Sequence, residues 1–174
     1  ALDKQVEEHF ACQDGHREVR NHAQDPPRLV AEADESDGSF LRLNPLIAVV
    51  TNIDADHLEN YGGDFERVKA AFSEFLHRLP FYGLAVLCID DAEVAALAAD
   101  MPRHVVTYGF AAHADVRAED VEQAGPAMRF TLCLPDGSRT PVTLALPGRH
   151  NVQNALAAAT IGWQLGVAPD TIAR

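Results

Sequence analysis

The sequence predicts an α/β fold: a mostly parallel sheet flanked by helices, with a small antiparallel β unit beside it. Three apolar runs, at residues 29–33, 46–50 and 84–89, carry this prediction. Each run gives way to polar residues at its carboxyl end, as buried parallel strands do. A helical pattern separates the second run from the third, and this alternation is typical of a sheet with right-handed crossovers.

An amphipathic helix is predicted from residue 64 to about residue 79. Its apolar side chains recur at three- and four-residue spacing, Asp64 can serve as its N-cap, and Pro80 ends it. A second helix is predicted at 92–100 and a strand at 104–108. These elements complete a β-α-β-α-β order.

The following segment alternates apolar and polar residues, which predicts antiparallel strands at 115–121, 128–134 and 140–146. Asp136-Gly137 supplies a hairpin turn between the last two strands. A helix is predicted from about 151 to 165, and Gly166 fits the position just after its end. A further helix starts at Pro169 and is cut off by the chain end, which predicts a truncated domain.

Residues 1–28 differ from the rest and are predicted to form an N-terminal extension to the domain of residues 29–174. Apolar residues at positions 2, 6 and 10 have the spacing of a short amphipathic helix, and Pro26-Pro27 marks a boundary. The histidines of this extension have no paired carboxylate or cysteine pattern, so we interpret them as solvated residues: His9, His16 and His22.

Composition excludes several classes of protein. The chain has 174 residues, 47% of them hydrophobic, and a formal net charge of −12, which argues against binding to duplex nucleic acid. No apolar run approaches the roughly 20 residues of a membrane-spanning helix. The three cysteines form no paired motif, so a disulfide framework is not expected and a reducing cytoplasm is the expected location.

Acidic residues follow the first two predicted strands. The first strand ends in Glu32, Asp34, Glu35 and Asp37, and the second is followed by Asp54, Asp56 and His57. Ligands of open α/β sheets bind beyond the carboxyl ends of the strands, and Mg²⁺ accepts one or two carboxylates together with phosphate oxygens. The pattern therefore fits a magnesium-bound nucleotide. A solvated acidic face, with turn residues and a loop histidine, is the alternative.

A second candidate site lies where the last long helix begins, in Gly148-Arg149-His150-Asn151-Val152-Gln153-Asn154. Asn151 and Asn154 are three residues apart and project from one face of the first turn. A carboxamide has both a donor and an acceptor, which suits an edge of adenine. For Asn151 an ordinary N-cap is the alternative, whereas Asn154 inside a helix costs stability unless it is exposed or bonded.

Four segments in order, at 29–37, 50–57, 79–86 and 147–154, resemble the central ATP-binding domain of the Mur ligase family. The Pro-Phe-Tyr-Gly segment at 80–83 resembles its alanine-adding members. The resemblance implies ATP and Mg²⁺ as cofactors, and UDP-N-acetylmuramate and L-alanine as substrates in peptidoglycan synthesis. It implies that ATP phosphorylates the muramyl carboxylate and that the L-alanine amine then attacks the acyl phosphate.

The resemblance also implies site residues. Glu32 and His57 match the family's two metal positions and are the predicted catalytic pair, with Glu35 as a further metal ligand. Asn151 and Asn154 match residues near adenine and ribose, with His150 beside them. Asn52 and Asp56 belong to the same motifs, and Phe72 stands where several sister ligases carry a carbamylated lysine.

The chain departs from the family in lacking the phosphate-binding loop, because its two lysines, Lys4 and Lys69, do not follow a glycine. We therefore expect a partial domain that is inactive in isolation. The alternatives are a non-catalytic remnant that binds a metal or a partner, and a magnesium-dependent phosphohydrolase that uses Asp54 and Asp56. A missing neighbour strand also predicts an exposed sheet edge and self-association, unless residues 1–28 cover that edge.

Overall fold

The computed structural model describes residues 17–19 and 28–174, which fall into two units, residues 1–40 and residues 41–174. The two units are described separately. None of the helices in the described ranges is both long and apolar enough to cross a membrane. The amphipathic helix predicted at residues 2–10 and the three histidines of the extension lie outside the described residues.

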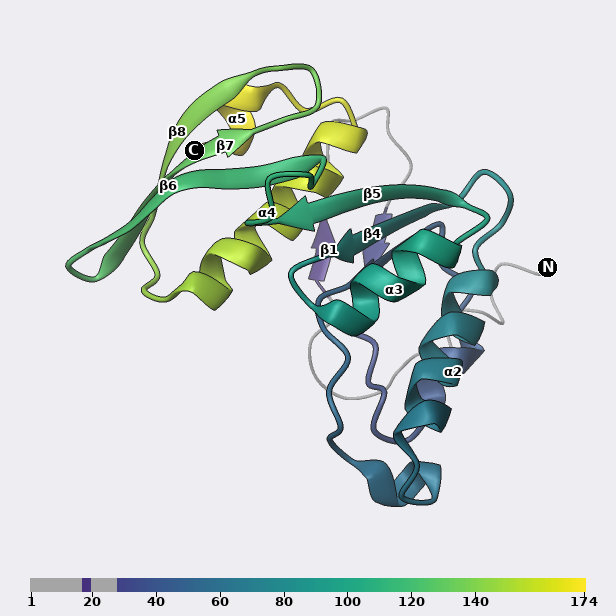
Figure 1. Cartoon of the computed structure of the whole chain (residues 1–174). Coiled ribbons are helices and arrows are strands. Elements are labelled where there is room, and N and C mark those ends of the chain that lie inside the picture. Colours follow the sequence, from purple (N-terminus) through teal and green to yellow (C-terminus); the bar gives the residue numbers. More distant parts are fainter. Residues whose placement is uncertain (1–16, 20–27) are drawn as a thin grey trace. The chain divides into compact units, whose positions relative to one another are not determined.

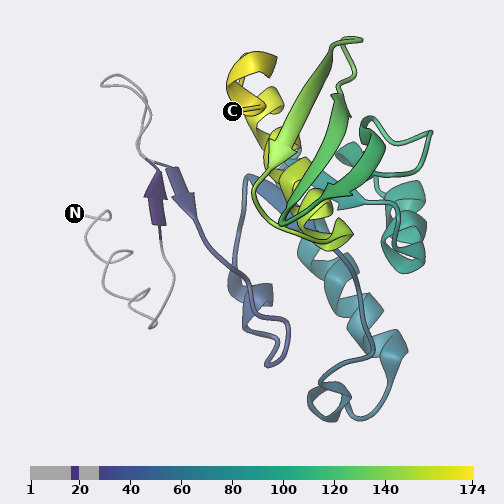
Figure 2. The ribbon, with the colours of Figure 1, turned by 90° about the vertical axis from the view of Figure 1, so that its left-hand side faces the viewer.

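The first unit contains a pair of short strands, β1 (Arg17–Val19) and β2 (Arg28–Val30), drawn in purple in Figure 2. They pair antiparallel, with Glu18 opposite Leu29. The side chains of Leu29 and Val30 are 68% and 58% exposed. The prediction of a buried parallel strand at 29–33 is therefore wrong for this segment. The physical reason is its length: only two large apolar residues stand between Arg28 and Glu32, too few to bury both faces of a strand.

The second unit is built on one six-stranded sheet, in the order β3-β4-β5-β6-β7-β8 (Figure 1). The first four strands run parallel and the last three form an antiparallel meander that includes β6. The strands are β3 (Ile47–Val50), β4 (Leu84–Cys88), β5 (His104–Gly109), β6 (Val116–Ala124), β7 (Ala127–Cys133) and β8 (Arg139–Leu144). The α/β fold class is confirmed. The antiparallel part continues the main sheet rather than standing beside it, because β6 pairs with β5.

Helices cover both faces of the sheet. They are α2 (Phe65–His77), α3 (Ala92–Asp100), α4 (Arg149–Gln164) and the short α5 (Pro169–Ile172), with 3-10 turns η1 (Ser39–Arg42) and η2 (Leu58–Tyr61). Figure 2 shows α4 (yellow-green) on one side of the sheet and α2 and α3 (teal) on the other. All five residues of β4 are buried, as expected for a strand covered on both faces. Leu84, Val86 and Cys88 pack in the cluster that includes Leu156 of α4.

Two predicted helix-end signals, the N-cap at Asp64 and the stop at Gly166, are confirmed. Asp64 caps α2 by accepting a hydrogen bond from the backbone N–H of Glu66. At the end of α4 the Gly166 N–H donates to Trp163 and the Val167 N–H donates to Gly162, which is the Schellman arrangement. The described helix α4 begins two residues before the predicted start, because Gly148 rather than Asn151 is its N-cap.

Candidate functional site

An open pocket of about 380 Å³ lies at the carboxyl ends of β3 and β4, against the first turns of α4. Its lining is mostly polar: Thr51, Asn52, Asp54, Cys88, Asp90, Asp91, His150, Gln153 and Asn154. The position is the one at which open α/β sheets bind ligands, and the volume lies within the range of small-molecule sites. All nine residues belong to the second unit.

The β3 wall is a chain of hydrogen bonds between neighbouring side chains. The Thr51 hydroxyl donates to Asn52 Oδ1 over 2.9 Å, and the amide of Asn52 donates to the carboxylate of Asp54. These bonds fix the orientation of the Asn52 amide and of one Asp54 oxygen. The wall therefore presents oriented carbonyl and carboxylate oxygens, which are the ligand types that Mg²⁺ prefers.

The β4 wall is dominated by Asp90, which accepts hydrogen bonds from three groups. The backbone N–H of Phe110 lies 2.9 Å from each carboxylate oxygen, the Ala111 N–H lies 3.1 Å away, and Gln153 Nε2 lies 2.9 Å away. The next residue, Asp91, caps α3 by accepting from the Val94 N–H over 2.9 Å. Both aspartates of the β4 end therefore have defined structural partners.

A buried thiol lies at the end of the same strand. Cys88 is 2% exposed, and Gln153 Nε2 lies 3.8 Å from its sulfur. Burial raises the pKa of the Cys88 thiol, so the group stays protonated and uncharged at neutral pH. Cys88 therefore contributes shape rather than charge to the pocket.

The α4 wall depends on Gly148, whose φ of 98° is accessible mainly to glycine. A Cβ on this residue would lie 2.6 Å from Cε1 of His150, so the glycine leaves room for the imidazole to fold back against the chain. His150 and Asn154 line the pocket. Their positions in the first turns of a 16-residue helix put them near its positive end, which favours anionic ligands.

The predicted adenine residues are only partly brought together. His150 and Asn154 share the pocket with Asn52 and Asp54, but Asn151 does not line it. The Asn151 amide donates instead to the backbone oxygen of Pro147 over 2.7 Å. Through this bond Asn151 stabilises the turn that precedes α4.

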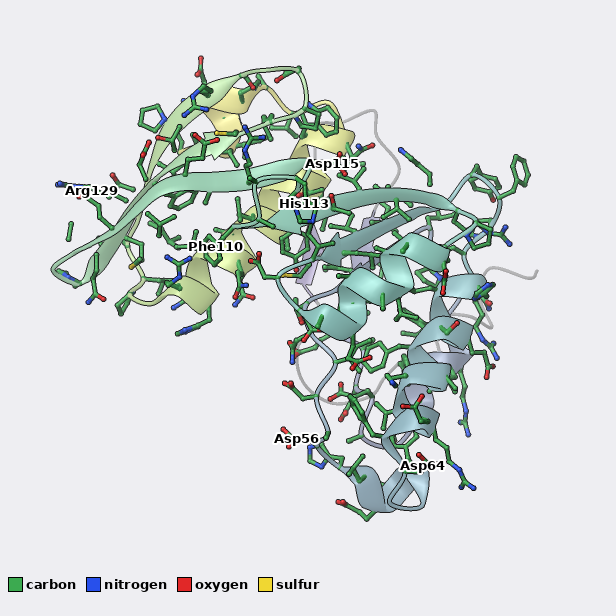
Figure 3. The ribbon with its side chains drawn as sticks, in the orientation of Figure 1. Asp56, Asp64, Phe110, His113, Asp115 and Arg129 are labelled. Atoms are coloured by element: carbon green, nitrogen blue, oxygen red, sulfur yellow. The ribbon has the colours of Figure 1, made fainter. Side chains whose placement is uncertain are left out.

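The histidine of the predicted metal pair lies in the loop after β3, outside the pocket lining. His57 has a left-handed backbone with φ 54°, and its Nδ1 is 3.9 Å from a carboxylate oxygen of Glu59. Its side chain is 55% exposed. Figure 3 labels the neighbouring Asp56 in this loop, well away from Phe110 in the loop after β5.

The other member of the pair, Glu32, belongs to the first unit together with Glu35. The approach of Glu32 to His57 stays a prediction. Within residues 17–19 and 28–174, no three His, Cys, Asp or Glu side chains are grouped closely enough to hold a metal ion.

Sequence reasoning missed Asp90 and Gln153. A signal for Asp90 was present, because the apolar run at 84–89 ends in Asp90-Asp91 at the same sheet edge as Thr51 to Asp54. Gln153 lay inside the recognised motif, but its partner is 63 residues away in the chain. Spacing within one motif gives no information about such a contact.

Comparisons with known proteins give a consistent result. The Mur ligase middle domain model matches residues 17–162. UDP-N-acetylmuramate–L-alanine ligase of Xanthomonas axonopodis pv. citri (strain 306) is 82% identical over 146 residues, which cover 84% of this chain and 31% of that enzyme. The same ligase of Xanthomonas oryzae pv. oryzae (strain PXO99A) is 80% identical over the same length. The chain thus spans about a third of the length of these curated relatives.

Solved structures agree with the sequence relatives. The structure of UDP-N-acetylmuramate-alanine ligase MurC from Thermotoga maritima has a TM-score of 0.67 and 26% identity, over 80% of this chain and 30% of that one. MurF from Acinetobacter baumannii has a TM-score of 0.65 and 28% identity, over 81% of this chain and 30% of that one. Since the family model covers residues 17–162, well over half of the sequence, the chain belongs to the Mur ligase family through its middle domain.

Proposed function

We propose that this chain is part of an ATP-dependent ligase that joins L-alanine to UDP-N-acetylmuramate, and that its pocket binds the nucleoside end of ATP. The observation that carries the proposal is the pocket at the ends of β3 and β4, into which α4 brings His150 and Asn154. The 82% identity to UDP-N-acetylmuramate–L-alanine ligase supports the choice of substrates. In the complete ligase, ATP supplies the activation that lets the muramyl carboxylate accept the amine of L-alanine.

The side chains at the pocket suit a nucleoside. The Asn154 carboxamide can donate to and accept from one edge of adenine, and the imidazole of His150 offers a flat face beside it. Asn154 is exposed at the helix surface, so its amide is accessible to a ligand. The N-terminal end of α4 adds a favourable field for the phosphates that follow the ribose.

Magnesium makes the pocket's acidity compatible with ATP. The pocket is lined by Asp54, Asp90 and Asp91, and at neutral pH these carboxylates repel a triphosphate. A divalent cation held by these carboxylates would offset that repulsion. Glu32 and His57 remain the proposed catalytic metal ligands, with Glu35 as a further candidate.

We expect the isolated chain to have no ligase activity. Of its two lysines, Lys69 is the one in the described residues, and it is engaged with Glu66 at 2.6 Å and Glu93 at 3.4 Å. Those ion pairs raise the pKa of Lys69 and hold it between α2 and α3, and Lys69 does not line the pocket. We therefore do not propose Lys69 as a phosphate-binding lysine. Release of ADP by the purified chain in the presence of UDP-N-acetylmuramate and L-alanine would contradict this expectation.

The nucleoside proposal is tested by an NMR titration of the ¹⁵N-labelled chain with adenosine and, separately, with Mg-ATP. We expect adenosine to shift the amide signals of residues 150–154 and the side-chain amide of Asn154. Asn154→Ala should weaken the binding of adenosine by about tenfold, the loss of one or two ligand hydrogen bonds. Gln164→Ala, at the far end of the same helix, is the matched control and should bind as the wild type does. Shifts caused by Mg²⁺ alone, with none from adenosine, would favour the metal-binding remnant.

A further inference from the structure

One pocket-lining carboxylate, that of Asp90, is hydrogen-bonded to two other segments of the chain. Asp90 follows β4, its Phe110 and Ala111 partners follow β5, and its Gln153 partner lies in α4. The three donors lie between 2.9 and 3.1 Å from the carboxylate oxygens. Hydrogen bonds to an ionised acceptor are stronger than those between neutral groups, so this contact is a firm one.

The backbone beside Asp90 is shaped for close approach. Gly109 has a φ of 153°, and a Cβ there would lie 2.6 Å from an oxygen of the Asp90 carboxylate. Only glycine allows the carboxylate to reach the Phe110 and Ala111 N–H groups at this distance. The contact therefore depends on two residues: Asp90, which supplies the carboxylate, and Gly109, which leaves room for it.

A second contact joins the same loop to α4. The guanidinium of Arg149 stacks on the Phe110 ring, 3.9 Å from its centroid. Figure 3 shows Phe110 beside the first turn of α4. The loop after β5 thus holds α4 at two points, Arg149 and, through Asp90, Gln153.

Helix geometry connects these two points to the pocket. Arg149 and Gln153 are four residues apart and form one row on the helix surface. His150 and Asn154 are also four residues apart and form the adjacent row, about 100° further round the helix. Fixing the first row therefore fixes the rotation of α4 and the direction in which the second row faces.

We propose that Asp90 is a positioning residue for the pocket: by holding Gln153 and the loop of Phe110 and Ala111, it sets the rotation of α4 and hence the direction of His150 and Asn154. The inference rests on the proposed function for the identity of the ligand, an adenine nucleoside. Asp90 acts here through hydrogen bonds and geometry, and needs no contact with the ligand or with a metal.

Four variants distinguish the hydrogen-bonding role of Asp90 from an effect of its negative charge. Asp90→Ala removes the acceptor, and Gln153→Glu opposes two carboxylates. Asp90→Asn keeps one side-chain oxygen that can accept from the backbone N–H groups of Phe110 and Ala111. Its new NH₂ group can donate to the oxygen of the Gln153 amide once that amide is rotated. The double variant Asp90→Asn with Gln153→Glu restores a donor and an acceptor in exchanged positions. Asp100→Ala, which removes an exposed carboxylate at the end of α3, is the control.

Adenosine binding is measured for each variant by the same NMR titration. We expect about tenfold weaker binding for Asp90→Ala and for Gln153→Glu, the equivalent of one charge-assisted hydrogen bond. Asp90→Asn, the double variant and Asp100→Ala should bind within about twofold of the wild type. Wild-type affinity in Asp90→Ala would overturn the inference. An equal loss in Asp90→Asn and Asp90→Ala would also overturn it, because charge rather than position would then be required.

Hydrogen exchange of the Phe110 and Ala111 amides tests the positioning contact without a ligand. Exchange should be slow in the wild type, fast in Asp90→Ala and slow again in Asp90→Asn. The amide chemical shifts of residues 149–154 should differ from those of the wild type in Asp90→Ala and return towards them in Asp90→Asn. If wild-type chain binds no adenosine, the proposed function fails while these measurements still decide whether Asp90 positions α4. If Asp90→Ala does not fold, the inference is tested instead by Gln153→Glu, which should weaken adenosine binding, and by the double variant with Asp90→Asn, which should restore it.

Discussion

The parallel and antiparallel parts of the sheet use their polar side chains in different ways. At the carboxyl ends of β3 and β4, Asp90 holds residues 20 to 63 positions away, and the surrounding groups line a pocket. On the antiparallel part, Glu119 of β6 instead accepts from Arg117 of the same strand over 2.9 Å and from Arg139 of β8, on the other side of β7, over 2.6 Å. Loops that converge at strand ends form a site in the first part, whereas charged side chains on one face of the meander pair with each other in the second.

The largest expected difference between the two parts comes from their glycines. Gly109→Ala places a Cβ against the Asp90 carboxylate and should lower the free energy of unfolding by about 2–4 kcal/mol, through overpacking and strain. Gly125→Ala, in the turn between β6 and β7, has a φ of 62° but no atom within 4 Å of the new Cβ. It should cost only about 1–2 kcal/mol. Urea unfolding measures both, and equal losses would contradict the assigned role of the turn at Gly109.

The two edges of the sheet are also expected to differ. Within the described residues, β3 is the edge of the parallel part and carries neither a charge nor a proline. The opposite edge, β8, contains Arg139 and Pro141, which discourage pairing with another chain. If the chain self-associates, Val49→Lys should weaken the association by about tenfold. Thr143→Lys, on β8, is the control for added charge and should leave it unchanged.

Light scattering at several protein concentrations measures this association. A clean monomer would mean that another segment covers the β3 edge, as suggested for residues 1–28. Equal effects of the two lysine substitutions would show that β3 is not the contact.

A smaller and pH-dependent effect is expected at Glu119. Arg139 first, and then Arg117, lower the pKa of this carboxyl from 4.5 to about 2. A lowered pKa in the folded state stabilises the protein above pH 4.5, and that contribution is lost as the pH falls towards 2. Glu119→Gln should therefore lower the melting temperature at pH 7, with a difference from the wild type that shrinks between pH 4.5 and pH 2.

Glu122→Gln is the matched control for Glu119, because its ion pair with Arg129 is longer, at 3.9 Å, and exposed. Its effect on the melting temperature should be small at every pH. A constant difference for Glu119→Gln across the same range would mean that the ion pairs of Glu119 are not responsible.

The elements that sequence predicts well depend on local chemistry. The cap at Asp64, the stop at Gly166 and the turn at Asp136-Gly137 each involve residues within about four positions of one another, and the structure confirms all three. The extension of β6 to Ala124 was not predicted. A register shift between Glu119 and Glu122, with Asp120 at φ 53°, lets that strand continue past the expected end.

The candidate site was predictable only in part, because it depends on contacts between distant segments. His150 and Asn154 were recognised from one motif, and Asn52 and Asp54 from another. The Asp90–Gln153 contact crosses 63 residues and has no local signature. The segment 29–33 was mispredicted as a buried parallel strand because its apolar run is too short to bury both faces: it forms an exposed strand that pairs antiparallel with β1.

The central claim, that the pocket at β3, β4 and α4 receives an adenine nucleoside, is tested most directly by intermolecular NOEs between adenosine protons and the protein. We predict NOEs from the adenine H2 and H8 protons to the side chains of His150 and Asn154. NOEs confined to other surfaces, such as the β6–β8 meander, would contradict the claim.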